Sequence, residues 1–219
     1  MIAEAGPDFG CGMEEVLEGY ARPYNPEHPV VCLDESPKQL ISERRQSVTE
    51  AKGIEHIDYE YNREGTVDLY MVVEPLGGKR ELQVTDHHTR LDWARVIAHV
   101  VEQMYPTAQK ITLVQDNLSA HKKSALYELF EPKRARTSLN KIELVFTPKH
   151  GSWLNIAEGE LSVLTRPGLK ERIASKDEMI QPTTAWYQAR NDQAANVDWQ
   201  FTTRDARIKL KRLYPSIKA

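Results

Sequence analysis

The sequence has little that would place it in a membrane or in an oxidising compartment. Across its 219 residues, no stretch approaches the ~20 consecutive apolar residues that a membrane-spanning helix needs, and no basic and apolar signal segment opens the chain. It has only two cysteines, Cys11 and Cys32. Cys32 lies inside an apolar run, which favours a buried, reduced thiol over a disulfide. We therefore expect a cytoplasmic protein without a membrane partner.

Strong net charge, internal repeats and low-complexity tracts are also missing. The formal net charge is −3, so the chain as a whole is not a simple basic nucleic-acid binder. Positive charge gathers at one end, because six basic residues and one acidic residue lie from position 200 onward. Such a tail suits contact with phosphate, and it equally suits a solvated helix face. The length and the 40% hydrophobic content fit one substantial domain with short appendages.

Strand-like and helix-like segments alternate along the chain and predict an α/β fold. Residues 30–35 begin an antiparallel meander, followed by a polar, loop-like segment over 36–53. A hairpin of 57–62 and 66–74 is expected around residues 63–65, with a third run after the turn at Gly77-Gly78. Later elements are strands at 110–116 and 142–148, and helices at 91–104, 122–130, 155–165 and 177–190. We expect a mixed sheet, in which a three-stranded meander joins parallel strands, flanked by helices.

Two of the predicted strands each deliver an aspartate after an apolar lead-in. Strand alternation puts Cys32 and Asp34 on one face of the first strand, and Val114 and Asp116 on one face of the later strand. If these strands are neighbours, the carboxylates converge and repel unless a cation joins them. Oxygen ligands suit Mg²⁺ or Mn²⁺ better than zinc. The alternative is that each aspartate forms a turn or caps a helix, and spacing alone does not decide between these readings.

A third acid is available in the helix expected after Asn155, which contains Glu158 and Glu160. The two side chains lie about 200° apart on an ideal helix, so both cannot enter one small site. The apolar stripe of this helix passes between them, and the helical wheel does not choose one of them.

Four sequence blocks carry a family resemblance. "VVCLDE", "LVQDNLSAH", "TPKHGSWLNIAEGELSVL" and "VDWQFTTRDARIKLKRLYP" resemble, in this order, blocks of the DDE transposases of bacterial insertion sequences related to mariner. The match covers nearly the whole chain from about residue 13, and the Asn-x-x-Glu of the third block is its most specific part. The resemblance implies a ribonuclease-H-like fold and a triad of Asp34, Asp116 and Glu158. It thereby selects Glu158 over Glu160.

The resemblance also implies a chemistry and its partners. The triad would be both catalytic and metal-binding, with Mg²⁺ or Mn²⁺ as cofactor and two ions in the DNA-bound state. Water would first cut the DNA at the ends of the insertion sequence, and the freed 3′-hydroxyl would then attack target DNA. A protein of this kind is expected to work as a homodimer and to associate with the nucleoid.

Several neighbouring residues gain supporting roles from the resemblance. Asn117 and His121 follow Asp116 in the family's Asp-Asn-x-x-x-His pattern and would steady that aspartate or touch DNA. The alternative is that Asn117 caps a helix and that His121 lies on the surface. Lys149, His150 and Asn155 precede Glu158 and would support the site or contact DNA. Trp153, in contrast, is expected to fill the core rather than to stack on a base.

The chain also departs from the family pattern. Complete members carry an N-terminal helix-turn-helix region, whereas only 29 residues precede the first expected strand. We therefore expect residues 30–219 to form the catalytic domain, with a basic C-terminal helix, and residues 1–29 to be the remnant of a lost junction. Gly159 and Pro167 interrupt the expected last catalytic helix, which should end near Thr165. The rival readings are a related nuclease without strand transfer and an inactive remnant that only binds DNA or protein.

Overall fold

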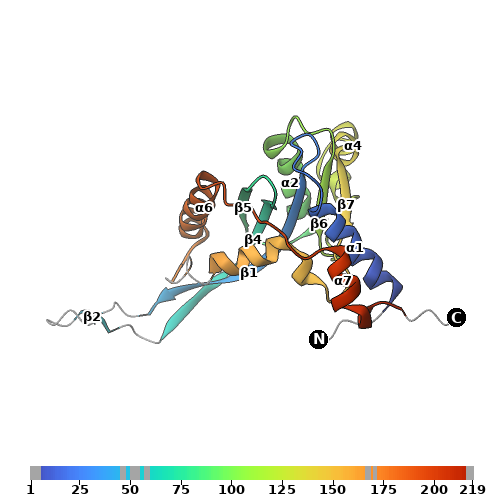
Figure 1. The fold of residues 1–219 in the computed structure, drawn as a ribbon. Coiled ribbons are helices and arrows are strands. Elements are labelled where there is room, and N and C mark those ends of the chain that lie inside the picture. The colour runs from blue at the N-terminus through green and yellow to red at the C-terminus, as the bar shows by residue number, and fades with distance from the viewer. Residues whose placement is uncertain are drawn as a thin grey trace.

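The fold is built on a five-stranded mixed sheet. The computed structural model describes residues 6–44, 48–49, 55–56, 60–165, 169 and 172–215. The strand order is β5–β4–β1–β6–β7, where β5, β4 and β1 are antiparallel and β1, β6 and β7 are parallel (Figure 1). The bounds are β1 Val30–Glu43, β4 Tyr61–Glu74, β5 Lys79–Thr85, β6 Ile111–Gln115 and β7 Ile142–Phe146. The expected meander joined to parallel strands is confirmed.

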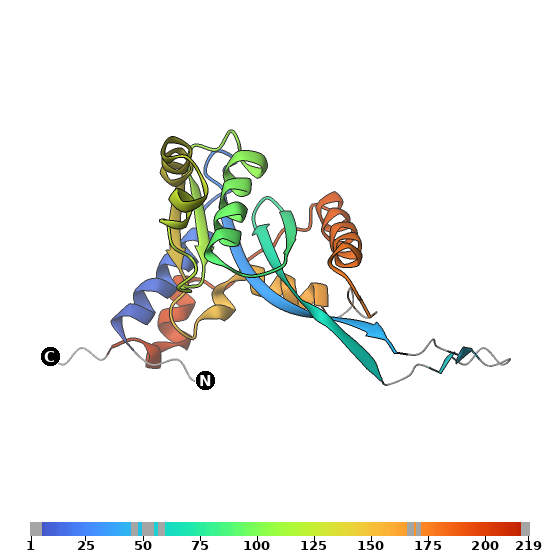
Figure 2. The same ribbon diagram turned by 180° about the vertical axis from the view of Figure 1, so that it is seen from behind.

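Strands β1 and β4 are longer than expected and form a ribbon that leaves the body of the protein (Figure 2). The prediction that 36–43 are loop is wrong, because this stretch pairs with β4 as far as Glu43 opposite Tyr61. Strand β6 pairs with β1 only up to Cys32, so this part of β1 is a sheet edge, where a proline such as Pro37 is tolerated. Beyond the ribbon, β2 (Val48–Thr49) pairs with β3 (Glu55–His56).

The hairpin expected around residues 63–65 is also wrong. Residues 61–74 form one continuous strand, and the register shifts between Leu40 and Ile41 on the partner strand. Gly65 pairs with Leu40, and Arg63 pairs with Ile41, so Glu64 is the extra residue of a bulge. Gly65 has a φ of 126°, and a glycine inside a strand often marks such a bulge rather than a turn. Part of the expected first strand, 57–59, lies outside the described residues.

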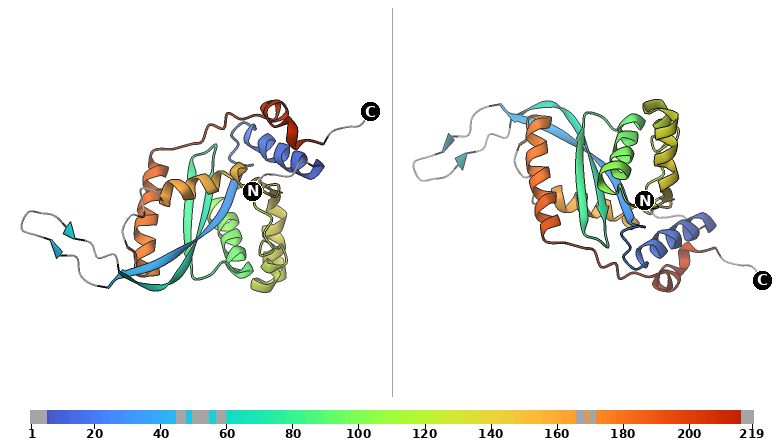
Figure 3. Two further views of the ribbon diagram at one scale, coloured as in Figure 1. Left: turned by 90° about the horizontal axis from the view of Figure 1, so that it is seen from below. Right: turned by 90° about the horizontal axis from the view of Figure 1, so that it is seen from above.

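One face of the sheet is covered by helices from both ends of the chain. These are α1 (Pro7–Tyr20), α5 (Ile156–Val163), α6 (Lys176–Asp192) and α7 (Thr203–Lys209). Helix α5 crosses β1 and β4, α6 packs on β5, and α1 lies between β7 and α7 (Figures 1 and 3). Met13, Val16 and Leu17 of α1 are buried in the same core as Val30 and Cys32 of β1. Residues 7–20 therefore belong to the packed domain.

The opposite face is covered by α2 (Arg90–His99), which continues into a π-helix over Val100–Met104, and by α3 (Ala125–Leu129) and α4 (Pro132–Lys141). Helix α2 and the strands around it match the prediction, whereas α3 is shorter than the expected helix over 122–130. Helix α4 was not predicted, because it buries only the small residues Ala135 and Ser138 and therefore shows no apolar stripe.

The remaining general expectations concern the cysteines and the membrane. Cys32 is buried and free, as predicted, and Cys11 is free and exposed. Within the described ranges, none of the helices combines the length and the apolar character needed to cross a bilayer. Helix α5 is assigned up to Val163, close to the expected end near Thr165, whereas Pro167 lies outside the described residues.

Candidate active site

Asp34 and Asp116 lie where two neighbouring parallel strands separate. The β1–β6 ladder pairs Val30 with Thr112 and ends with Cys32 opposite Val114. Each aspartate comes two residues later in the chain, Asp34 within β1 and Asp116 just after the end of β6. Because parallel strands present their carboxyl ends at one edge of the sheet, the neighbourhood of β1 and β6 brings the two carboxylates to the same place. The condition set by the sequence, that these strands be neighbours, is therefore met.

Helix α5 brings Glu158 to this edge, and Asn155 fixes where the helix begins. The Asn155 side chain accepts a hydrogen bond from Ala157 N at 3.2 Å, which caps the helix. Its amide donates to Leu33 O at 2.8 Å, just beyond the last pair of the β1–β6 ladder. Asn155 is 3% exposed, so this link between helix and strand is buried. Glu158, one turn further, is thus anchored relative to β1.

The three acids line one cavity of about 370 Å³, together with Asn155 and Lys38. Burial, the largest cause, and the nearby charges of Glu35, Asp116 and Glu158 together raise the pKa of Asp34 to about 7. Such a shift is typical of a buried carboxyl group that has other carboxylates, and no cation, beside it. A set of carboxylate oxygens with unbalanced negative charge is chemically suited to a hard divalent cation.

Glu160 points to a different environment. It is 5% exposed, and its carboxylate lies 3.0 Å from Arg80 Nε and 2.9 Å from Arg190 Nη2. Arg80 is itself 1% exposed and also donates to Ala195 O at 2.6 Å. This buried cluster joins α5, β5 and α6. Of the two glutamates that the helical wheel left open, Glu160 is therefore engaged in packing and Glu158 faces the cavity.

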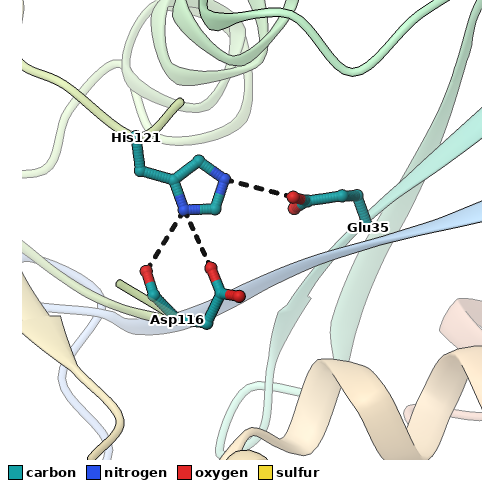
Figure 4. A group of neighbouring side chains, drawn as sticks. All are labelled: Glu35, Asp116 and His121. Atoms are coloured by element: carbon teal, nitrogen blue, oxygen red, sulfur yellow. Dashed lines mark hydrogen bonds and ion pairs between the residues drawn. The ribbon is translucent and has the colours of Figure 1, made fainter. Parts of the chain in front are cut away.

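His121 bridges Asp116 and Glu35 (Figure 4). Its Nδ1 lies 3.0 Å from Asp116 Oδ1, and its Nε2 lies 3.3 Å from Glu35 Oε1. Burial alone would lower the pKa of His121, but the carboxylates of Asp116 and Glu35 outweigh it and raise the pKa to about 10. The imidazole is therefore a buried cation at neutral pH. The reading of His121 as a surface residue is wrong, because its side chain is 1% exposed.

The other residues singled out from the sequence lie around a second cavity of about 770 Å³. Asn117, Lys149 and His150 line it, and Asp116 borders both cavities. Asn117 and Lys149 are exposed. Trp153 was expected in the core but is 45% exposed, and its ring packs edge-on against Phe201 at 6.0 Å. A short 3₁₀ turn, Ser152–Leu154, buries Leu154 instead.

Two residues near the triad were not singled out from the sequence. Glu35 was missed because strand alternation places it on the face opposite Asp34, yet it lines the cavity. Lys38 was missed because its segment was read as a loop. Once β1 is known to continue, the alternation of Asp34, Ser36 and Lys38 on one face would have found it.

Comparisons with known proteins show the family and the fold of this chain. Residues 29–180 match the family described as DDE superfamily endonuclease. Since the match covers more than half of the chain, the protein belongs to the DDE superfamily of endonucleases. A comparison with curated proteins finds no match.

Solved structures of the Mos1 mariner transposase share the fold. The Mos1 paired-end complex with the left transposon end is 14% identical, with a TM-score of 0.61, over 94% of this chain and 60% of that chain. The paired-end complex with Mn is 16% identical, with a TM-score of 0.56, over 85% and 56% of the two chains. The strand transfer complex is 14% identical, with a TM-score of 0.58, over 85% and 55%. The present chain thus spans little more than half of the matched chains, and the likeness shows the ribonuclease-H-like fold.

Proposed function

We propose that this chain is the catalytic domain of a transposase that cleaves DNA at the ends of an insertion sequence and joins them to target DNA. The observation that carries the proposal is the placement of Asp34, Asp116 and Glu158 around one cavity in a chain of the DDE superfamily. These three residues would be the catalytic triad. We assign residues 30–219 to this domain and residues 1–29 to an N-terminal extension whose helix α1 packs into the same core.

The same three carboxylates would hold Mg²⁺ or Mn²⁺, and we infer two ions when DNA is bound. This is supported by the Mos1 paired-end complexes with Mn and with Mg, and by the burial and neighbouring carboxylates that raise the pKa of Asp34. When bound, such ions lower the pKa of water and balance charge in an in-line phosphoryl displacement. The protein itself has little covalent work to do in such a reaction, and its residues mainly orient the reacting groups.

DNA would enter along the adjoining cavity. Asn117, His150 and the cation of Lys149 line that cavity, and Lys38 provides a second cation beside the triad. Lysine ammonium groups are point charges that suit phosphate oxygens. In this proposal the DNA backbone crosses the triad with lysines on either side. The Mos1 structures are paired-end and strand-transfer complexes, which supports a homodimer acting on element ends and target DNA. Its place of action would be the cytoplasm, at the nucleoid.

The test is nicking of supercoiled plasmid in Mg²⁺ or Mn²⁺ by the parent chain and by Asp116→Asn. The parent should nick the plasmid, and Asp116→Asn should be inactive while still folded. A donor oligonucleotide added to the assay distinguishes the transposase from a nuclease without strand transfer, since only the former yields joined products. A parent that binds DNA but never nicks it would support the inactive, binding-only remnant. Undiminished nicking by Asp116→Asn would refute the site.

A further inference from the structure

The contact between Glu35 and His121 lies where the backbone no longer holds β1 and β6 together. Their ladder ends at Cys32 and Val114, and beyond it β1 continues with β4 alone. The chain after Asp116 leaves the sheet as a loop. His121 comes from this loop and reaches back to Glu35 on β1. The side chains therefore form a bridge across the gap in which the candidate metal ligands lie.

The His121 ring has a fixed orientation. It stacks on Trp93 of α2, with ring centroids 5.7 Å apart and planes inclined by 24°. Trp93 is itself buried, and its Nε1 donates to Gln115 Oε1 at 3.0 Å. These contacts leave Nδ1 facing Asp116 and Nε2 facing Glu35 (Figure 4). Rotation of the ring would lose both contacts.

The bridge also restrains the Asp116 carboxylate. Oδ1 lies 3.0 Å from His121 Nδ1 and accepts from Leu118 N at 3.4 Å, while His121 Nδ1 also lies 3.2 Å from Asp116 O. The second carboxylate oxygen points away from the ring (Figure 4). Contacts of this kind to a ligating side chain fix its orientation and typically change metal affinity 10–100-fold.

We propose that Glu35 and His121 are positioning residues, in which Glu35 orients His121 and His121 holds Asp116 ready to bind a divalent cation. The inference rests on the proposed function and deepens it. Direct cation binding by His121 is the competing interpretation. The geometry disfavours it, because both ring nitrogens already face carboxylates and the side chain is 1% exposed. Glu35 is equally enclosed, with an 8% exposed side chain and a buried Oε2 that has no hydrogen-bond partner among the described residues.

The experiment measures Mn²⁺ affinity, by titration calorimetry and by the electron paramagnetic resonance signal of free Mn²⁺, without DNA. Glu35→Ala and His121→Ala should each weaken Mn²⁺ binding about 10–100-fold. The double variant should be no weaker than His121→Ala, because Glu35 acts through His121. His121→Asn keeps a donor near the Nδ1 position and should recover part of the affinity, as should Glu35→Gln, which keeps an acceptor for Nε2.

The chain offers a matched control in another histidine–glutamate pair. His99 Nε2 lies 2.6 Å from Glu81 Oε1, and neither residue lines the cavity. His99→Ala and Glu81→Ala should leave Mn²⁺ affinity unchanged. Thermal unfolding of every variant separates a loss of folding from a loss of metal binding. If an alanine variant does not fold, His121→Asn and Glu35→Gln replace it in the Mn²⁺ titration.

Three results would overturn parts of this picture. Unchanged Mn²⁺ affinity in folded Glu35 and His121 variants, beside a parent that binds normally, would refute the inference alone. A further loss on adding Glu35→Ala to His121→Ala would make Glu35 a direct ligand and would also refute it. Absence of Mn²⁺ binding by the parent would instead count against the proposed function.

Discussion

Replacing Asn155 should loosen the active site and destabilise the fold by a calculable amount. The side chain performs two tasks: it caps α5 through Ala157 N and donates to Leu33 O inside the protein. Loss of a cap costs about 1 kcal/mol, and a buried carbonyl left without its donor costs about 1–3 kcal/mol. We therefore expect Asn155→Ala to lower the free energy of unfolding by roughly 2–4 kcal/mol.

Two further variants separate the two tasks. Asn155→Asp keeps the cap but has no donor for Leu33 O, so it should still cost about 1–3 kcal/mol. Thr89→Ala is the control, since Thr89 caps α2 by a capping box and is exposed. It should cost about 1 kcal/mol and leave Mn²⁺ binding intact. Asn155→Ala should also weaken Mn²⁺ binding, because Glu158 lies one turn beyond the cap.

The measurement is urea unfolding followed by circular dichroism, combined with Mn²⁺ titration of each folded variant. The m-value should not change, so that a lower midpoint reports stability. An Asn155→Ala variant no less stable than Thr89→Ala would refute the reasoning, because the buried donor would then contribute nothing. So would an Asn155→Asp variant as stable as the parent.

Further predictions concern packing and pH. Arg80→Ala should lower the free energy of unfolding by about 3–5 kcal/mol, because it breaks a buried ion pair and leaves Glu160 with Arg190 alone. A loss under about 1 kcal/mol in urea unfolding would contradict this. Trp153→Ala should cost under about 1 kcal/mol, whereas an alanine at the fully buried Trp93 should cost about 3–5 kcal/mol; equal losses would show that Trp153 is core. Without metal, the difference in free energy of unfolding between Asp34→Asn and the parent should grow in favour of the variant as the pH rises from about 4 to 7. Folding raises the pKa of Asp34 from 3.8 to about 7, so the folded parent retains a proton that the unfolded chain has released, and its stability falls with pH in this window. A pH-independent difference in urea midpoints would contradict this origin.

Local patterns were sufficient to predict the strands at the centre of the sheet, whereas the convergence of two carboxylates was predicted only on the condition that their strands are neighbours. Alternation along the apolar runs places Asp34 and Asp116 just after them, and a parallel pairing of β1 with β6 then brings them together. The helical wheel of α5 could not choose between Glu158 and Glu160 as the third acid, because the choice depends on residues that are distant in the sequence. Glu160 forms ion pairs with Arg80 and Arg190, which lie far from it in the sequence.

The errors arose where tertiary contacts override local signals. Pro37 and polar neighbours indicate a loop, yet pairing with β4 keeps that stretch extended. Trp153 has the size of a core residue, but a 3₁₀ turn exposes it. His121 contacts Glu35 of β1 from a loop and stacks on Trp93 of α2, and no local pattern encodes contacts between such distant segments.

The buried cluster around Glu160 has a practical consequence for shortening this chain. The family match stops at residue 180, inside α6, but a protein cut there would lose Arg190 and Asn191. Asn191 pairs by its side chain with both backbone groups of Arg80, at 2.8 Å each, and so acts as a substitute neighbour for the edge of β5. The cut would also remove the fully buried Ala206 from the helix beside α1. The smallest portion able to fold unaided must therefore extend well past the segment by which the family is recognised.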